Sequence, residues 1–364
     1  MKHPIDPQPV LDDSKTVGEI DRRAFFRLIG AAAAPLIVPG CLSEVDEEGH
    51  DLIRLRDVNP SVVRSIKVRR ARNNQPILGR PEHLSIDDDL AVYLSLGDQC
   101  RVVRSNGRVA LYTVGDVRSE KGNKRVRMSE AARERLGTSG IFSAKLHTQV
   151  VAEGLTDEEA KDQSEFVERL VDDGEQDELV VLAPHGGSIE LRTELQAEYM
   201  RSRVEALGRP VSSWICLGYK KGGGAFDQWH ITSTDLSPNS FPGLDALVDR
   251  GPEGAGFTNA VIFHGLSGDN VIVGGGAPMA LKDDIRQAID DAFAALDPPL
   301  EIEVTIATGN EGHSGDSTRN VVNWLTKDGV GGIQISSSKA VRLNKTHREA
   351  IVDAIIAVLY QPVE

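Results

Sequence analysis

Two histidines and one glutamate have the residue types and the spacing of a metal site. His185 follows the apolar segment 177–182 and precedes two glycines, and Glu190 comes five residues later. His264 repeats this arrangement, because the apolar segment 259–263 also ends in His-Gly. A buried strand that ends in a histidine places the imidazole at the carboxyl edge of a sheet, where open α/β sheets bind ligands. Two imidazoles and a carboxylate are a standard set of zinc ligands, and a fourth position open to water makes such a site hydrolytic.

A third histidine in a strand-like setting, His230, lies between the other two in the segment Trp-His-Ile-Thr-Ser-Thr. A lone histidine is more often a partly buried residue bonded to the backbone than a metal ligand. The repeated context of a strand followed by His-Gly shifts this balance for His185 and His264, taken together with Glu190. For His230, a metal ligand and a partly buried residue bonded to the backbone stay about equally favoured.

Strand-like and helical segments alternate over residues 156–364 and must position these side chains. The periodicity predicts helices and strands in alternation at 192–207, 211–219, 280–296, 302–308 and 344–359. Alternating β and α segments indicate an α/β fold, an open and mixed but mostly parallel sheet flanked by helices.

Residues 1–41 have the features of an export signal. Arg22 and Arg23 resemble a twin-arginine motif, and the apolar run 28–38 is too short to span a bilayer as a mature helix. The sequence Val-Pro-Gly-Cys then resembles a lipoprotein box with Cys41 as the acylated residue. We expect an exported protein at the extracellular face of the cytoplasmic membrane, held to the membrane only by its lipid anchor.

An acidic tether at 42–51 leads into residues 52–151, where short strands and turns replace the α/β pattern. Asn106 and Gly107 separate two apolar runs and predict a hairpin with a tight turn. The order strand, short helix at 130–136, glycine, strand is similar to the repeating unit of double-psi β-barrels, a likeness of fold that gives no function. We therefore expect a small β-barrel-like domain that spaces or binds and has no chemistry of its own.

The composition limits the classes of partner. The 364 residues carry a net charge of −14 and a sequence pI of about 5.2. No basic stripe is present to neutralise phosphates, which argues against nucleic acid. Like charge also slows the encounter with a polyanionic substrate unless salt screens it.

Several motifs in series resemble the poly-γ-glutamate hydrolase family over about half of the chain, from Asp177 to the C-terminus. They lie at residues 185–190, 193–195, 229–235, 240–242, 263–265, 273–275, 320–323, 325–326 and 332–335. The resemblance implies an α/β core similar to that of zinc carboxypeptidases. It also implies Zn²⁺ held by His185, Glu190 and His264, and a γ-glutamyl polymer or peptide as the substrate.

Two positions depart from the family pattern. Trp324 stands where the family usually has an arginine suited to a substrate carboxylate, and Ser336 stands where it has the glutamate expected to act as general base. Serine cannot relay a proton as a carboxylate does, and general acid–base catalysis typically contributes about 10²–10⁴-fold. Glu311 and His313 are substitutes for this base if their glycine-rich loop folds over the metal, although a solvated loop is the simpler expectation.

These features lead to one hypothesis and two rivals. The leading hypothesis is an exported zinc-dependent amidohydrolase that cleaves γ-glutamyl amide bonds, with His230, Asn320 and Asn323 orienting the substrate. The first rival is a catalytically weak surface lipoprotein that binds a γ-glutamyl or related polymer, which Ser336 and Trp324 favour. The second is a zinc carboxypeptidase-like enzyme on ordinary peptides, which the missing arginine weakens because a substrate carboxyl terminus needs a cationic partner.

Overall fold

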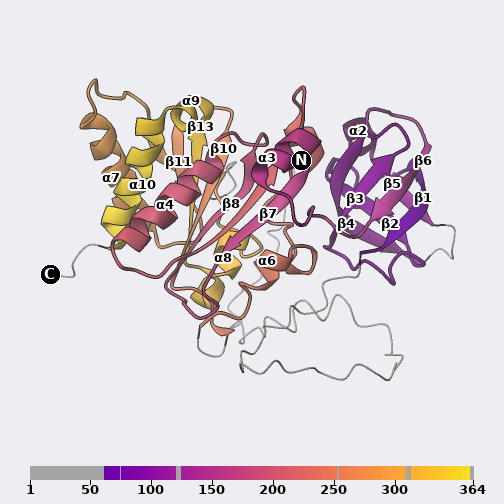
Figure 1. Cartoon of the computed structure of the whole chain (residues 1–364), viewed down its shortest axis with the longest axis horizontal. Coiled ribbons are helices and arrows are strands. Elements are labelled where there is room, and N and C mark those ends of the chain that lie inside the picture. The colour runs from indigo at the N-terminus through magenta and orange to yellow at the C-terminus, as the bar shows by residue number, and fades with distance from the viewer. Residues whose placement is uncertain are drawn as a thin grey trace, which may run out of the picture. The chain divides into compact units, whose positions relative to one another are not determined.

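The computed structural model describes residues 61–73, 75–119, 124–251, 254–307, 309 and 313–360. These residues form a closed β-barrel followed by a mixed sheet with helices on both faces (Figure 1). The fold class predicted from the sequence is therefore confirmed. The predicted export signal, the acidic tether and Cys41 lie outside the described residues. Within the described ranges, no helix has the length and apolar character needed to cross a membrane.

The barrel precedes the α/β sheet along the chain. Its strands follow one another in the order β1 (Val63–Arg70), β5 (Arg125–Met128), β2 (His83–Asp87), β4 (Val109–Arg118), β3 (Gln99–Arg104) and β6 (Phe142–His147). Antiparallel pairing of β6 with β1 closes the ring. Helix α2 (Glu130–Arg135) begins at Ser129, whose hydroxyl accepts a hydrogen bond from the N–H of Ala132. The fully buried Val68 and Tyr112 are among the side chains that fill the interior.

The sheet of the α/β part has seven strands. Their order is β12 (Val304–Ile306), β11 (Val271–Gly274), β13 (Gly332–Ser338), β10 (Asn259–Leu266), β8 (Leu179–Gly187), β9 (Ser212–Gly218) and β7 (Phe166–Val171). The four central strands β13, β10, β8 and β9 run parallel, whereas β7 pairs antiparallel with β9, and β11 pairs antiparallel with β13. The sheet is thus mixed and mostly parallel.

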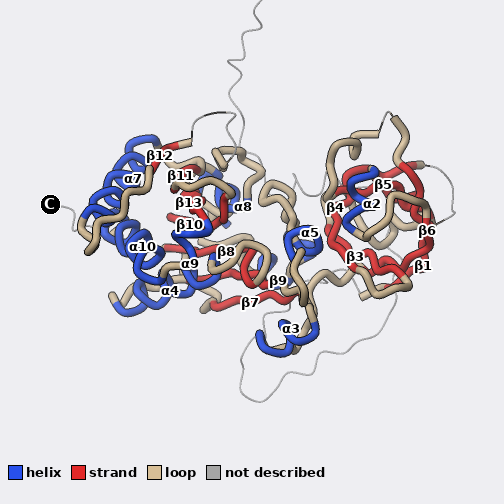
Figure 2. Tube along the Cα trace, turned by 90° about the horizontal axis from the view of Figure 1, so that it is seen from above, coloured by secondary structure: helices blue, strands red, loops and turns tan. Residues whose placement is uncertain are grey.

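Helices cover both faces of this sheet (Figure 2). One face packs against α4 (Thr193–Ala206), α7 (Met279–Ala294) and α10 (Lys345–Leu359). The opposite face packs against the shorter α5 (Ala225–Trp229), α6 (Pro242–Asp245) and α8 (Val321–Trp324). The described chain also contains α3 (Asp157–Gln163), α9 (Lys339–Leu343) and the 3₁₀ turns η1 (Pro238–Ser240) and η3 (Lys327–Gly329).

Side chains along the central strands alternate between two apolar cores. Val181 of β8 and Phe263 of β10 belong to the core under α4, α7 and α10. Val180 and Ile262 belong to the core on the opposite face. Because the side-chain period of a strand is two residues, His264 leaves β10 on the same face as Ile262.

The strand order reverses between β8 and β10. From β8 the chain passes through α4 to β9 on one side, and it then returns through α5 and α6 to β10 on the other side of β8. The carboxyl ends of two parallel strands at such a switch point border a crevice in which open α/β sheets bind ligands. His185 and His264 both lie near these strand ends.

Candidate metal centre

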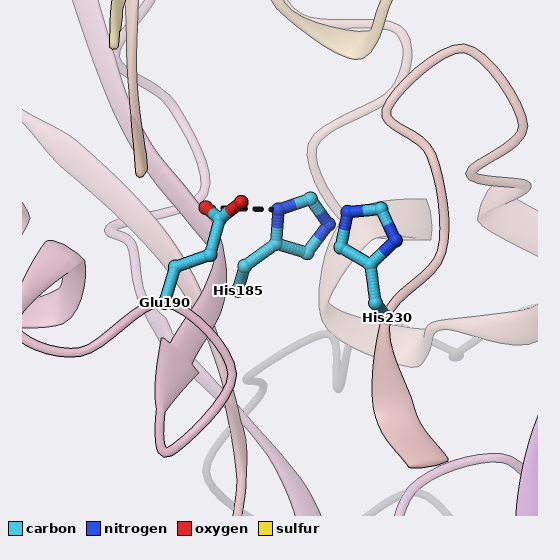
Figure 3. A group of neighbouring side chains, drawn as sticks. All are labelled: His185, Glu190 and His230. Carbon is cyan, nitrogen blue, oxygen red and sulfur yellow. Dashed lines mark hydrogen bonds and ion pairs between the residues drawn. The ribbon is translucent and has the colours of Figure 1, made fainter. Parts of the chain in front are cut away.

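The ends of β8 and β10 bring two imidazoles and one carboxylate together. The Nδ1 atoms of His185 and His264 are 3.2 Å apart. Oε2 of Glu190 lies 3.2 Å from Nδ1 of His185 and 3.4 Å from Nδ1 of His264. Both histidines are buried, and the Glu190 side chain is 11% exposed. Figure 3 shows the dashed contact between the His185 ring and the Glu190 carboxylate.

Three donor atoms with these separations fit a zinc ion. Zinc bonds of about 2.0–2.1 Å at tetrahedral angles put neighbouring ligand atoms about 3.3 Å apart. The second ring nitrogens are already engaged, since Nε2 of His185 donates to the carbonyl oxygen of Ile231 at 2.8 Å and Nε2 of His264 lies 3.1 Å from the Ser233 hydroxyl. A carbonyl only accepts, so a neutral His185 presents the lone pair of Nδ1 to the centre.

Glycines beside the first histidine let two strands approach closely. A bulge interrupts the pairing of β8 with β9 between Ala183 and Gly186. A Cβ on Gly186 would lie 2.9 Å from the carbonyl oxygen of Cys216, and Gly187 has a φ of +71°. Both glycines belong to β8 itself, so the turn that carries the chain to Glu190 begins only after them.

Gly265, the residue after His264, serves a different purpose. Its N–H donates to Oε2 of Glu190 at 2.9 Å, and a Cβ at this position would collide with the guanidinium of Arg342. Arg342 donates to the carbonyl oxygens of Leu191 and Ser337. The glycine therefore makes room for a buried cation behind the centre, a residue that the sequence analysis missed because it lies far along the chain.

Burial and neighbouring charges set the protonation of the three side chains. Burial alone would raise the pKa of Glu190, but the adjoining rings of His185 and His264 hold that pKa well below its ordinary value. Burial acts to lower the pKa of His185, and the Glu190 carboxylate outweighs it and raises that pKa. Burial lowers the pKa of His264. An ionised carboxylate beside a neutral imidazole suits metal binding, which requires deprotonated ligands.

His230 is a competing ligand beside this centre. Its ring is tilted against that of His185, with centroids 4.2 Å apart (Figure 3), and stacks on the ring of Phe226 at the same centroid distance. Among the described residues, His185, Glu190 and His230 offer ligand atoms within 4.8 Å of one another and so form an alternative metal-binding group. The set with His264 has the better geometry, because its donor atoms are separated by only 3.2–3.4 Å.

A pocket of about 260 Å³ opens over these residues. Residues 232–234 form one wall, residues 313–317 form another, and Asn320 and Gln334 contribute amide groups. Hydroxyl and amide side chains make up half of the described lining, histidines and carboxylates make up most of the rest, and this lining contains no Lys or Arg. Walls of this kind suit hydrogen bonds to an amide-containing ligand.

The three residues predicted to take part in catalysis have different locations. His313 lines the pocket and is exposed, with a left-handed φ of 71°. Ser336 is fully buried in β13, in register with His264, and the described pocket lining does not include it. Its hydroxyl lies 3.5 Å from Nε2 of Gln334, which does line the pocket. Glu311 lies outside the described residues.

Of the two asparagines predicted to orient the substrate, Asn320 caps the start of α8 and Asn323 lies within this helix. Asn320 lines the pocket and donates to Oε1 of Gln334 at 3.0 Å. Asn323 is fully buried, and its amide group donates to the carbonyl oxygens of Gly315 and Ser317 while accepting from the N–H of Gly276. Asn323 thereby supports one wall of the pocket from behind, and it does not belong to the described lining.

Two carboxylates near the pocket escaped the sequence analysis. Asp316 lines it and accepts from the Ser314 hydroxyl at 2.9 Å. It stands one residue beyond the glycine-rich loop singled out for Glu311 and His313, so that loop was the available signal. Glu82 comes from the barrel and hydrogen-bonds His230. No spacing in the sequence connects residues so far apart.

The fold and the site together define an α/β protein with a candidate metal centre of two histidines and a glutamate at a switch point of its sheet. Residues 153–351, more than half of the chain, match the family model of poly-gamma-glutamate hydrolases. The chain therefore belongs to this hydrolase family, as the motif resemblance predicted. No curated protein sequence matches the chain.

Solved structures with a related fold include three of interest. A bacteriophage poly-gamma-glutamate hydrolase is 22% identical, with a TM-score of 0.38, and the match covers 52% of this chain and 87% of that one. The zinc-free form of YNDL is 20% identical, with a TM-score of 0.41 and coverage of 57% and 96%. A metallo-carboxypeptidase from Burkholderia cenocepacia is 12% identical, with a TM-score of 0.33 and coverage of 72% and 79%.

Proposed function

We propose that this protein is a zinc-dependent amide hydrolase that acts on γ-glutamyl bonds. The observation that carries the proposal is the convergence of Nδ1 of His185, Oε2 of Glu190 and Nδ1 of His264 within 3.2–3.4 Å of one another. This cluster borders a polar pocket in a chain of the poly-gamma-glutamate hydrolase family. Membership of the family supports the γ-glutamyl bond as the substrate.

The donor set suits zinc and leaves a position open toward the pocket. A zinc ion bound there would polarise the substrate carbonyl and lower the pKa of a water molecule toward about 7. The Ile231 carbonyl and the Ser233 hydroxyl hold the two imidazoles in orientation. The amides of Asn320 and Gln334, which bond to each other, line the pocket that would receive the polar backbone of a substrate.

Proton transfer to the leaving amine requires a group within reach of the pocket. His313 and Asp316 both line the pocket, whereas Ser336 is buried and does not belong to the described lining. We therefore place general acid–base catalysis on the wall formed by residues 313–317. Glu311, a neighbour of this wall in the sequence, stays a candidate.

A substrate carboxylate needs a cationic partner, and Arg319 is the residue that we propose for this role. Its side chain is 57% exposed, and its guanidinium pairs with Asp235 at 3.0 Å and lies 3.4 Å from the carbonyl oxygen of Thr234, a lining residue. An exposed guanidinium beside the pocket can bind the free carboxylate of a γ-glutamyl unit. Arg319 thus compensates for Trp324, which packs against the apolar core instead.

One observation favours the rival function. The position at which the family has its catalytic glutamate is occupied by Ser336, a buried residue outside the described lining. A protein with this substitution that keeps its metal centre and its polar pocket would bind a γ-glutamyl polymer and turn it over slowly. In either case, the proposed location is the extracellular face of the membrane, through export directed by Arg22 and Arg23 and a lipid on Cys41.

Metal analysis combined with an assay on poly-γ-glutamate tests the proposal. The purified chain should contain stoichiometric zinc and shorten the polymer, and removal of the metal with a chelator should stop the reaction. The matched control for a metal-ligand variant such as His264→Ala is His347→Ala, because His347 lies on α10, which covers the other face of the sheet. Zinc without hydrolysis would favour the binding protein, and absence of zinc would contradict both proposals.

A further inference from the structure

The barrel makes a direct polar contact with one wall of the pocket. Oε1 of Glu82 is 2.5 Å from Nδ1 of His230, and Oε2 accepts from both the N–H and the hydroxyl of Thr232 at 3.0 Å. His230 and Thr232 line the pocket. The Glu82 side chain is only 14% exposed, so its bond to His230 is largely shielded from water. A single carboxylate of the barrel therefore fixes two residues of the pocket wall.

Further contacts hold the same loop to the barrel. His83 pairs with Asp235 at 3.1 Å, and the Gln99 amide donates to the carbonyl oxygen of Asp235 and accepts from the N–H of Ser237. Arg135 donates to the carbonyl oxygen of His230 at 3.1 Å. Residues 230–237 have no strand partner in the sheet, so bonds from the barrel and bonds from the α/β part, such as those to His185 and His264, together hold this loop.

An apolar contact also joins the barrel to the α/β part. Leu111 of β4 is fully buried in the core that contains Trp229, the residue before His230. The guanidinium of Arg101 lies over the Trp229 ring, 5.1 Å from its centroid. The interior of the α/β part thus continues up to a barrel strand.

The Glu82 carboxylate also selects one state of the His230 ring. A carboxylate accepts and does not donate, so Nδ1 of His230 must carry the hydrogen and Nε2 is left as the acceptor. The same ring lies against His185, a residue of the candidate metal centre. Burial would raise the pKa of Glu82, but its bond to His230 and the charges of His230 and Arg135 lower it to about 2.

We infer that the barrel is a working part of the hydrolytic site, in which Glu82 is a positioning residue that acts through His230. Glu82 holds the imidazole in one orientation and one tautomer, so that the wall formed by residues 230–234 is preorganised for the bound substrate. This inference rests on the proposed amide hydrolase function, and it assigns to the barrel a role in that same site.

The variant Glu82→Gln tests this role in the full, zinc-loaded chain. Its amide nitrogen must face either Thr232, where it meets a second donor, or His230, where it forces the other tautomer. We expect kcat/KM on poly-γ-glutamate to fall by up to about 10²-fold, mainly through kcat, with the zinc content unchanged. The control is Glu134→Gln, which changes an exposed glutamate of the same barrel and should have no effect.

A double-mutant cycle separates positioning from a general loss of structure. If Glu82 acts through His230, adding Glu82→Gln to a His230→Ala chain should lower kcat/KM by less than about 3-fold further. Additive losses would overturn the inference. We also expect Glu82→Asp, which keeps a carboxylate on a shorter side chain, to recover part of the kcat/KM that Glu82→Gln loses.

Hydrogen exchange gives a result that does not depend on activity. Amides of residues 230–237 should exchange faster in Glu82→Gln than in Glu134→Gln, while those of β8 and β10 stay protected. If Glu82→Gln does not fold, the same comparison is made with Thr232→Ala, which removes one bond of the contact from the other side. Unchanged exchange would refute the positioning role even in an inactive protein, whereas an inactive wild-type chain with the expected exchange would refute only the hydrolase function.

Discussion

The metal centre and the pocket wall at residues 230–237 are held in different ways. The centre comes from the ends of two adjacent parallel strands, and the ladder of β8 and β10, paired up to Leu182 and Ile262, carries His185 and His264 to the same edge of the sheet. The wall is a loop, and side chains of the barrel such as Glu82 and Gln99 supply part of the bonds that hold it in place. The residues of the metal centre are thus positioned within one sheet, whereas the shape of the pocket also depends on the contact between the barrel and the α/β part.

Loss of a metal ligand should have the largest effect, because it removes the centre without touching the wall. His264→Ala is expected to lose zinc and essentially all hydrolysis. His230→Ala is expected to keep stoichiometric zinc, since His230 lies in the wall. Metal analysis of the two purified variants measures this difference. Retention of zinc in His264→Ala and its loss in His230→Ala would mean that the alternative ligand group is the real one.

The wall at residues 313–317 should have the next largest effect. Asp316→Asn or His313→Ala is expected to lower kcat by about 10²–10⁴-fold, whichever of the two moves the proton, and to leave the zinc content unchanged. Steady-state kinetics on the polymer identifies the residue. If neither substitution changes kcat, Glu311→Gln, two residues before this wall in the sequence, is the remaining variant to measure.

Restoring the family glutamate should have a smaller effect, in the direction of gain. Ser336 is in register with His264 on the neighbouring strand, so a longer side chain at 336 leaves the sheet on the same face as His264. Ser336→Glu is expected to raise kcat/KM by up to about 10²-fold if proton transfer limits turnover. Trp324→Arg should give no such gain, because Trp324 packs against the apolar core outside the described pocket lining and Arg319 already offers a carboxylate partner. A fast wild-type enzyme whose kcat/KM is unchanged by Ser336→Glu would contradict the idea that a missing base limits turnover.

The smallest effect concerns stability and probes the barrel contact alone. The pKa of Glu82 is lowered from 4.5 to about 2 in the folded chain, so its contribution to stability is complete above about pH 4.5 and is lost as pH falls toward 2. The contribution is on the order of 3 kcal/mol at most, because one pKa unit corresponds to about 1.4 kcal/mol. Urea unfolding of wild type and Glu82→Gln should show a stability gap near pH 6 that narrows toward pH 3. A gap that stays constant over this range would show that the carboxylate is not stabilised by the contact.

The fold class could be predicted from sequence because its signals are local. Apolar runs of strand length and amphipathic helices predicted segments close to those observed, such as 280–296 for α7 and 344–359 for α10. The Asn106 and Gly107 pair likewise lies between β3 and β4, which pair antiparallel as a hairpin. Each signal depends on the nearest few residues, and burial of the apolar face of each element then leaves few ways to stack them.

By itself the sequence determined the residue types of the centre and their place at strand ends, because a strand followed by His-Gly puts an imidazole at the edge of a sheet wherever the strand lies. Tertiary structure alone decided that β8 and β10 are neighbours, that Arg342 stands behind Gly265, and that a barrel glutamate holds His230. Such contacts join residues far apart along the chain, and no local periodicity encodes them. They form only when segments that are far apart in the sequence pack against each other in the folded chain.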